Sequence, residues 1–182
     1  MKEIVEHIKA GKVAVVPTDT LYGIIADAHN SEAVEKVYKL KKRNRQKACI
    51  VLINNIDQLK EFGCMLPENI KKEIKDVWPG PITILLPVTD NEKAPHVHRG
   101  LSSIAFRMPH QEIFISQLIH RTGPIIAPSA NTEGGIPAKN IQEAKEYFGD
   151  TVVYHDIGDI KNTKPSTIIA FDQKGQKTIL RP

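Results

Sequence analysis

The sequence predicts an α/β protein whose open, twisted, mixed sheet is flanked by helices in a single domain. Segments with helical periodicity alternate with short apolar runs that are typical of buried strands. Several neighbouring strands also follow one another with no helix between them, which favours a mixed sheet over a purely parallel one. No Pro-, Gly- or Ser-rich linker divides the 182 residues, so we expect one domain over residues 1–182.

The first expected elements are a short amphipathic helix, a strand and a longer helix. Apolar residues 4, 5 and 8 form one face of the first helix, and a strand follows over residues 12–17. Ser31 is a good N-cap for the longer helix, and the pairs Glu32–Lys36 and Glu35–Lys39 support its exposed face. The residues expected on its buried face are Ala33, Val34, Val37 and Tyr38.

The rest of the chain continues the alternation of helices and strands. The helix expected over about 110–121 should bury Ile113, Phe114, Leu118 and Ile119. A further helix is expected near 140–148, and helical segments are expected at 56–63 and 67–78. The expected strands lie at 48–53, 81–87, 103–109, 124–128, 151–155, 166–171 and 177–182.

The composition is that of a globular protein without a membrane span. Hydrophobic residues make up 41% of the chain and charged residues 25%. No apolar run reaches the roughly 18 to 20 residues that a span needs, and the charged first segment is unlike a signal peptide, so we expect a cytoplasmic protein. Cys49 and Cys64 fit no metal-ligand or redox spacing, and Cys49 lies inside an apolar run, which predicts reduced thiols and a core position for Cys49.

The net charge of +4 is unevenly distributed along the chain. Residues 39–47, KLKKRNRQK, hold six cations in nine positions. Such a run is either a solvated helix face or a site for RNA or for polyanionic phosphates. Aromatic residues make up only 5% of the chain and none is interleaved with these cations, so stacking on bases is poorly supported.

Polar and turn-forming residues recur where the expected strands end. The stretch PTDTLYG at 17–23 follows the first strand, and PSANTEGG at 128–135 follows another. Ligands of open α/β sheets bind in a crevice at strand ends, so we expect these side chains to meet in one site. The residues concerned are Thr18, Thr20, Arg107, Ser129, Asn131, Ser166 and Arg181.

This set of residues suits a phosphate-bearing ligand better than covalent catalysis. No glycine-rich nucleotide motif is present and no nucleophile elbow surrounds Ser129, so separate cations would have to hold a triphosphate. His96 and His98 lack a companion carboxylate cluster, so no metal site is expected there. Asp19 is either a turn-forming or a catalytic residue. The cations suited to phosphate are Arg43, Lys47, Arg107 and Arg181.

A series of motifs runs through residues 13–182 in the order PTDTLYG, KKRNRQKACIVLI, WPGPITILL, SIAFRMP, IIAPSANTEGG, KPSTIIAF and ILRP. In this order they resemble the YrdC-like family, the threonylcarbamoyl-AMP synthases of tRNA modification. The resemblance implies a positive concave face and the conversion of L-threonine, bicarbonate and ATP into threonylcarbamoyl-adenylate and pyrophosphate. ATP would be a substrate, with Mg²⁺ bound mainly through the nucleotide. A partner transferase complex would then modify an adenosine beside the tRNA anticodon.

The same resemblance implies roles for single residues. The L-threonine contacts would be Thr20, Arg107, Ser129 and Ser166. The ATP contacts would be Lys41, Arg43, Lys47, Ser103, Asn131, Lys139 and Arg181. Because no covalent nucleophile is needed, catalysis would consist of positioning and charge stabilisation, chiefly by Arg43 and Lys47.

The chain departs from the family pattern in a few places. Leu52 stands where some family members carry a His that contacts threonine, and Ala48-Cys49 replaces the usual Pro-Leu. The chain stops at Pro182 without a second domain, so it resembles the short, single-domain branch.

Two other functions stay open at this stage. One is a non-catalytic RNA-binding module that uses residues 39–47, which a steep salt dependence of RNA binding without nucleotide turnover would favour. The other is a carbamoyltransferase that uses carbamoyl-adenylate with a different acceptor. The absence of zinc-finger or acylphosphatase-like segments counts against it by analogy with multidomain relatives.

Overall fold

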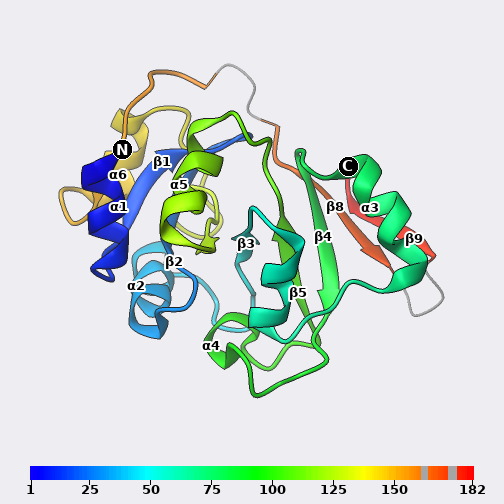
Figure 1. Ribbon diagram of the computed structural model, residues 1–182. Coiled ribbons are helices and arrows are strands. Elements are labelled where there is room, and N and C mark those ends of the chain that lie inside the picture. Colours follow the sequence, from blue (N-terminus) through cyan, green and yellow to red (C-terminus); the bar gives the residue numbers. More distant parts are fainter. Residues whose placement is uncertain (161–163, 172–175) are drawn as a thin grey trace.

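The centre of the fold is one mixed β-sheet. A computed structural model describes residues 1–160, 164–171 and 176–182. Within these ranges it contains a nine-stranded sheet of order β7-β1-β2-β6-β3-β5-β4-β8-β9 (Figure 1). The pairs β1–β7, β3–β5 and β4–β8 are parallel and the other neighbouring pairs are antiparallel, so the predicted mixed α/β class is confirmed. The strands are β1 (Ala14–Pro17), β2 (Tyr22–Asp27), β3 (Ile50–Leu52), β4 (Ile82–Pro87), β5 (Ser103–Arg107), β6 (Ile125–Ile126), β7 (Val153–Tyr154), β8 (Thr167–Phe171) and β9 (Lys177–Arg181).

Helices cover both faces of the first half of the sheet. The helices within the described ranges are α1 (Lys2–Lys9), α2 (Ser31–Lys41), α3 (Lys71–Val77), α4 (Pro95–His98), α5 (Phe114–Thr122) and α6 (Ile141–Phe148), with the short 3₁₀ helices η1 (Ile56–Phe62) and η2 (Glu68–Ile70). Helices α1 and α5 pack against each other and against β1, while α2 packs against β2. As a result every residue of β1 is buried. Val15 packs into the hydrophobic cluster on one face of the sheet, and Ala14 and Val16 pack into the cluster on the other face. None of the helices within the described ranges is long and apolar enough to cross a membrane.

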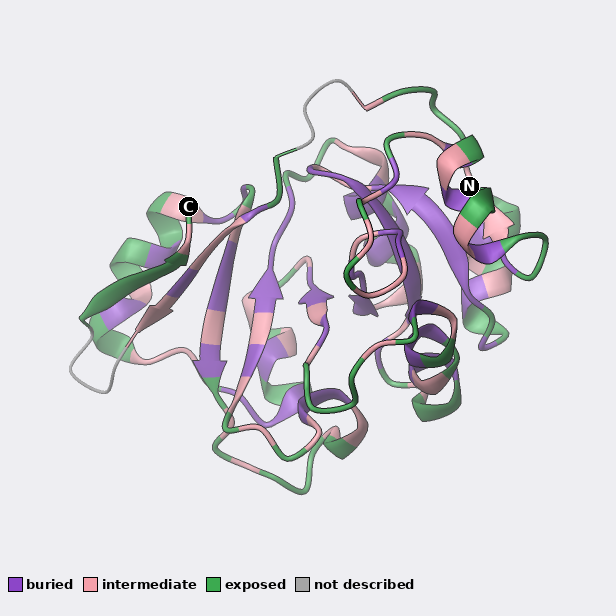
Figure 2. Cartoon of the chain, turned by 180° about the vertical axis from the view of Figure 1, so that it is seen from behind, coloured by how far each residue is buried: buried purple, intermediate pink, exposed green. Residues whose placement is uncertain are grey.

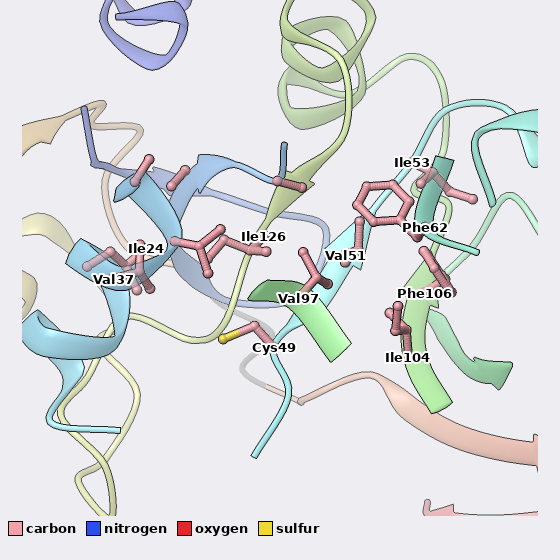
Figure 3. Close-up of a cluster of buried hydrophobic side chains, with 14 of the residues drawn as sticks. Ile24, Val37, Cys49, Val51, Ile53, Phe62, Val97, Ile104, Phe106 and Ile126 are labelled. Atoms are coloured by element: carbon pink, nitrogen blue, oxygen red, sulfur yellow. The ribbon is translucent and has the colours of Figure 1, made fainter. Parts of the chain in front are cut away.

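Two hydrophobic clusters stabilise this arrangement. The larger one runs along one face of the sheet from Ile24 on β2 through Val51 on β3 to Phe106 on β5 (Figure 3). The smaller one lies on the other face, where Ile8 of α1 and Leu118 of α5 meet β1 and β2. Cys49 and Cys64 are free thiols in the larger cluster, as predicted for Cys49.

The second half of the sheet is left open on the face opposite the larger cluster. Arg107 pairs directly with Leu52 on one side and with Thr83 on the other, and directly paired residues share a face. Leu85, on the same face of β4 as Thr83, is only half-buried. Strand β9 at the edge is almost wholly exposed (Figure 2). This open face carries Arg107 at the end of β5.

The strand β2 is not predicted from the sequence pattern. Its residues, YGIIAD, do not alternate between apolar and polar, because both faces of the strand are buried. β2 pairs with β1 in a hairpin in which Pro17 lies opposite Tyr22, so PTDTLYG forms the turn and the first residues of a strand. The motif therefore lies at the tip of a hairpin rather than in a loop before a helix.

The start of α2 and its charge pairs differ from the prediction. Asn30, not Ser31, is the N-cap: its side-chain oxygen accepts the backbone N–H three residues on at 3.0 Å. Glu35 forms ion pairs with Arg99 at 2.6 Å and with Arg45 at 3.2 Å instead of with Lys39. Two cations outside the helix thus replace the local helix pair.

The buried face of α5 is rotated relative to the prediction. The helix begins at Phe114, after Ile113 in an extended conformation, so both residues are half-buried at its start. Phe114 stacks on the ring of His155 with a centroid distance of 4.1 Å. The buried apolar residues of the helix are Ile115, Leu118 and Ile119.

Candidate functional site

The polar strand ends meet in one pocket. Its volume is about 200 Å³, and it is bounded by the β1–β2 hairpin, by the ends of β3 and β5, and by the segments beside β6, β8 and β9. All of the strand-end residues predicted to converge line this pocket, except Asn131, and Arg43 joins them. These lining residues are Thr18, Thr20, Arg43, Arg107, Ser129, Ser166 and Arg181.

The hairpin turn at residues 18–21 is held by the hydroxyl of Thr18. This hydroxyl accepts the backbone N–H groups of Thr20 and Leu21, both at 3.2 Å, and donates to the carbonyl of Leu21 at 2.7 Å. Such a threonine turn fixes the local backbone. Thr20 is therefore presented to the pocket from a rigid turn, with its own hydroxyl 3.2 Å from that of Thr18.

Arg107 enters the pocket as one half of a buried ion pair. Its Nη2 lies 2.9 Å from Oδ1 of Asp19 at the tip of the hairpin, and the two side chains are only 4% and 7% exposed. Burial lowers the pKa of Arg107, and the charge of Asp19 opposes that shift. The sequence left open whether Asp19 forms the turn, and the geometry assigns that task to Thr18 instead.

Ser166 and Arg181 form the opposite wall of the pocket. The Ser166 hydroxyl lies 2.8 Å from that of Thr83, and Nε and Nη2 of Arg181 donate to the Ser166 carbonyl at 2.9 and 2.7 Å. Partial burial lowers the pKa of Arg181. Strand β9 is thus attached to the segment before β8, and the guanidinium of Arg181 lies at the wall of the pocket.

The Ser129–Asn131 loop is held from behind by a buried lysine. Nζ of Lys41 donates to the carbonyls of Ser129 and Asn131 at 2.5 and 2.6 Å. The Ser129 hydroxyl donates to the side-chain oxygen of Asn131 at 2.6 Å, and the Asn131 amide donates to the carbonyl of Gly135 at 2.9 Å. Lys41 and Asn131 therefore lie behind the pocket lining and shape the loop that presents Ser129.

The basic segment contributes one guanidinium to the lining. Arg43 donates to the carbonyls of Lys47 and Ala48 at 3.2 and 2.7 Å, which folds the segment back on itself. Lys47 does not line the pocket, because its ammonium pairs with Glu133 at 2.6 Å. Glu133 also accepts the backbone N–H of Asn44, and these bonds lower its pKa. No motif in the sequence marks Glu133 as a site residue, although it stands two residues after Asn131.

Three further predicted or compared positions lie outside the pocket lining. Ser103 begins β5 on the same face as Arg107, but four residues of strand, roughly 13 Å, separate them. Lys139 is exposed before α6, where its backbone N–H donates to Glu143. Leu52 is fully buried in the smaller cluster, so it acts as a core residue at the place of the family histidine.

The described residues offer no ready set of ligands for a metal ion. Within 1–160, 164–171 and 176–182, no three His, Cys, Asp or Glu side chains gather in a suitable group. The imidazoles of His96 and His98 bond the carbonyls of Ala28 and Asn91 at 2.9 and 3.1 Å. Both histidines therefore have structural partners.

Comparisons with known proteins identify relatives along the whole chain. The family model described as "Telomere recombination", which covers the Sua5, YciO and YrdC proteins, matches residues 6–182. A threonylcarbamoyl-AMP synthase of Marinobacter nauticus is 36% identical over 167 residues, which are 90% of this chain and 87% of that protein. One of Pyrococcus abyssi is 33% identical over 177 residues, 96% of this chain but 51% of that protein. The chain thus spans about half the length of this second relative.

Solved structures share the fold over the full chain. The structure of P. abyssi Sua5 complexed with L-threonine has a TM-score of 0.86 and 30% identity, and covers 100% of this chain and 53% of the Sua5 chain. Full-length HypF in its phosphate- and nucleotide-bound form has a TM-score of 0.84 over 99% of this chain and 28% of its own. Because HypF is only 22% identical, its similarity to this chain concerns the fold alone.

Proposed function

Since the chain belongs to the family of Sua5, YciO and YrdC proteins, we propose that it is a threonylcarbamoyl-AMP synthase. The reaction joins L-threonine, bicarbonate and ATP into threonylcarbamoyl-adenylate and releases pyrophosphate. The observation that carries the proposal is the meeting of three hydroxyl side chains, Thr20, Ser129 and Ser166, with three guanidinium groups in one pocket. Hydroxyls and guanidinium groups together suit a small polar substrate beside a polyanion.

The small pocket suits the amino-acid substrate. Its volume of about 200 Å³ is below the range of roughly 300–1,000 Å³ that is common for drug-sized ligands. We place L-threonine here, with Arg107 on its carboxylate and with Thr20, Ser129 and Ser166 as hydrogen-bonding partners. P. abyssi Sua5, which shares this fold, has been solved with L-threonine.

ATP would extend from this pocket over the open face of the sheet. Arg43 and Arg181 line the pocket and are assigned to the phosphates. Lys47 would join them if the nucleotide displaced Glu133 from its ammonium. Lys41 and Asn131 would act through the loop that they hold, whereas Ser103 and Lys139 would reach parts of the nucleotide outside the pocket.

The chemistry needs positioning and charge stabilisation rather than a nucleophile of the protein. The amine of threonine attacks the carbon of bicarbonate, and loss of water leaves a carbamate. A carbamate oxygen then attacks the α-phosphorus of ATP, the bond to the bridging oxygen breaks, and pyrophosphate leaves with the negative charge. Arg43 and Arg181 would stabilise that charge.

The metal ion, the partners and the location that we propose follow from this reaction. Because no suitable ligand group gathers within the described ranges, Mg²⁺ would arrive with the nucleotide. The product is an activated acyl-adenylate, so a transferase complex that modifies tRNA would consume it, and the protein would work in the cytoplasm. Direct contact with RNA would use the exposed cations of segment 39–47, such as Lys42 and Arg45.

Mass spectrometry of a mixture of protein, ATP, L-threonine and bicarbonate tests the proposal. We expect the mass of threonylcarbamoyl-adenylate, together with ATP–pyrophosphate exchange that requires both threonine and bicarbonate. Mixtures that lack threonine or bicarbonate are the controls. Exchange that continues without threonine, or no adenylate at all, would refute the proposed activity.

A further inference from the structure

Asp19 at the tip of the β1–β2 hairpin has no local task. In tight turns, an aspartate commonly accepts hydrogen bonds from the backbone of its own turn. Here the Thr18 hydroxyl accepts the N–H groups of Thr20 and Leu21. Apart from the ion pair with Arg107, neither carboxylate oxygen of Asp19 has a hydrogen-bond partner among the described residues, although the side chain is only 7% exposed. Burying such a charge is costly, so its position needs another explanation.

The group that faces Asp19 is distant in the chain. Arg107 ends β5, and in the strand order β6 and β3 lie between β5 and the hairpin strand β2. The ion pair at 2.9 Å therefore connects the hairpin tip to a strand on the other side of the sheet's centre. Arg107 lines the pocket and Asp19 does not. The carboxylate thus acts on the guanidinium and not on the pocket contents.

We propose that Asp19 is a positioning residue that holds the guanidinium of Arg107 in the orientation in which it binds the carboxylate of the substrate amino acid. This inference rests on the function proposed above for the same pocket. Arg107 also faces a like charge, since Arg181 lies close enough to act on it. The carboxylate of Asp19 offsets this repulsion and keeps a buried guanidinium charged and aligned. Because Nε of Arg107 has no partner among the described residues, the ion pair is the contact that orients the group.

Steady-state kinetics of Asp19→Asn test the proposal first. The amide keeps the shape of the side chain but removes its charge. We expect the KM for threonine to rise about 10- to 100-fold, the scale of a misplaced binding group, and the KM for ATP to stay within about twofold. Asp57→Asn is the matched control, because Asp57 is 77% exposed and pairs with Lys60 on the surface. If the KM values for threonine and for ATP rose equally in Asp19→Asn, the change would have damaged the whole site, and the proposal would be overturned.

A double-mutant cycle separates an action through Arg107 from a direct contact with substrate. If Asp19 acts only through Arg107, Asp19→Asn has nothing left to misplace once Arg107→Met has removed the guanidinium. The double variant should then match Arg107→Met in kcat/KM for threonine within about twofold. A further tenfold loss in the double variant would mean that Asp19 touches the substrate itself, against the proposal.

Two further readouts do not depend on activity. In thermal unfolding, the loss of stability in the double variant should be smaller than the sum of the losses in the two single variants. The reason is that each single change leaves one buried charge unpaired. The ¹⁵Nε NMR signal of Arg107 should shift or broaden in Asp19→Asn. If the wild type shows no threonine-dependent exchange, the proposed function fails while these readouts still decide on the pair. Additive unfolding losses and an unchanged Arg107 signal would overturn the positioning role.

Discussion

The ammonium of Lys41 lies 2.5 Å from the carbonyl oxygen of Ser129, a residue 88 positions further along the chain. It also donates to the carbonyl of Asn131 at 2.6 Å, and the backbone carbonyl of Lys41 accepts the N–H of Glu133 at 2.8 Å. Three hydrogen bonds therefore connect the last turn of α2 to the loop after β6. Burial of this ammonium lowers the pKa of Lys41 to about 8, with the charge of nearby Arg43 as the next cause.

The first prediction concerns the titration of Lys41. We expect its ¹⁵Nζ NMR signal to titrate near pH 8 rather than near the pKa of about 10.4 of a lysine in a model peptide. Above this pH the neutral amine holds the two carbonyls less strongly, so ATP–pyrophosphate exchange should fall. Besides Arg43, the groups that act on the ammonium are Cys49 and Glu133. A midpoint above pH 10 would contradict the prediction.

The contribution of Lys41 to stability should rise with pH, whereas the exchange activity should fall. Because its pKa is lowered on folding, the unfolded chain binds more protons than the folded protein between pH 8 and 10.5. The contribution of this group to the free energy of unfolding therefore rises with pH in that window, by about 3 kcal/mol in all. Urea unfolding of the wild type and of Lys41→Met across this range measures the difference. The gap between them should shift by that amount in favour of the wild type.

The second prediction concerns two neighbouring arginines of the basic segment. Arg43→Ala should lose about 2–4 kcal/mol of transition-state stabilisation in ATP–pyrophosphate exchange, the scale of one lost electrostatic donor. Arg45→Ala is the matched control, because its side chain is 71% exposed and pairs with Glu35 on the surface. Its effect should stay within about 0.5 kcal/mol. Near-wild-type exchange by Arg43→Ala would reject the role of Arg43 in the pocket.

The third prediction concerns recognition of the substrate hydroxyl by Thr20. A site that hydrogen-bonds a hydroxyl rejects an analogue that lacks it, so threonine should exceed 2-aminobutyrate by at least about 100-fold in kcat/KM. Serine, which keeps the hydroxyl, should lie between them. Thr20→Val should narrow this discrimination, while Thr122→Val, at the far end of α5, should leave it unchanged. Equal rates for the three amino acids would exclude hydroxyl recognition.

The fourth prediction concerns residues 157 and 158, which lie shortly after β7. The Tyr22 hydroxyl donates to the carbonyl of Gly158 at 2.9 Å and accepts the N–H of Ile157 at 3.1 Å. Tyr22→Phe should therefore lower the free energy of unfolding by about 1–2 kcal/mol, measured in urea. In Tyr154→Phe a more exposed hydroxyl loses its hydrogen bond to the carbonyl of Gly149. The free energy of unfolding should then fall by less than about 0.5 kcal/mol. Equal losses of unfolding free energy in the two variants would mean that the Tyr22 hydroxyl does not stabilise residues 157 and 158.

Local patterns in the sequence are sufficient for most elements and for the strand-end residues that line the pocket, except Asn131. The periodicity of Val34, Val37 and Tyr38 predicts the buried face of α2, and that face is confirmed. The strand β2 was missed because a strand buried on both faces lacks alternation, and the hairpin turn before it contains no glycine. The N-cap of α2 was misplaced by one residue because Asn30 and Ser31 are both good caps.

By itself, the sequence determined the mixed α/β class and the polar residues that stand at strand ends, because both follow from local hydrophobic periodicity and turn chemistry. Only the tertiary structure decided that Arg43 lines the pocket while Lys41, two residues earlier, supports the loop behind it. It also decided that Asp19 faces Arg107. These contacts depend on strand order and register, which bring together groups about 90 residues apart, and no local pattern encodes which of them meet.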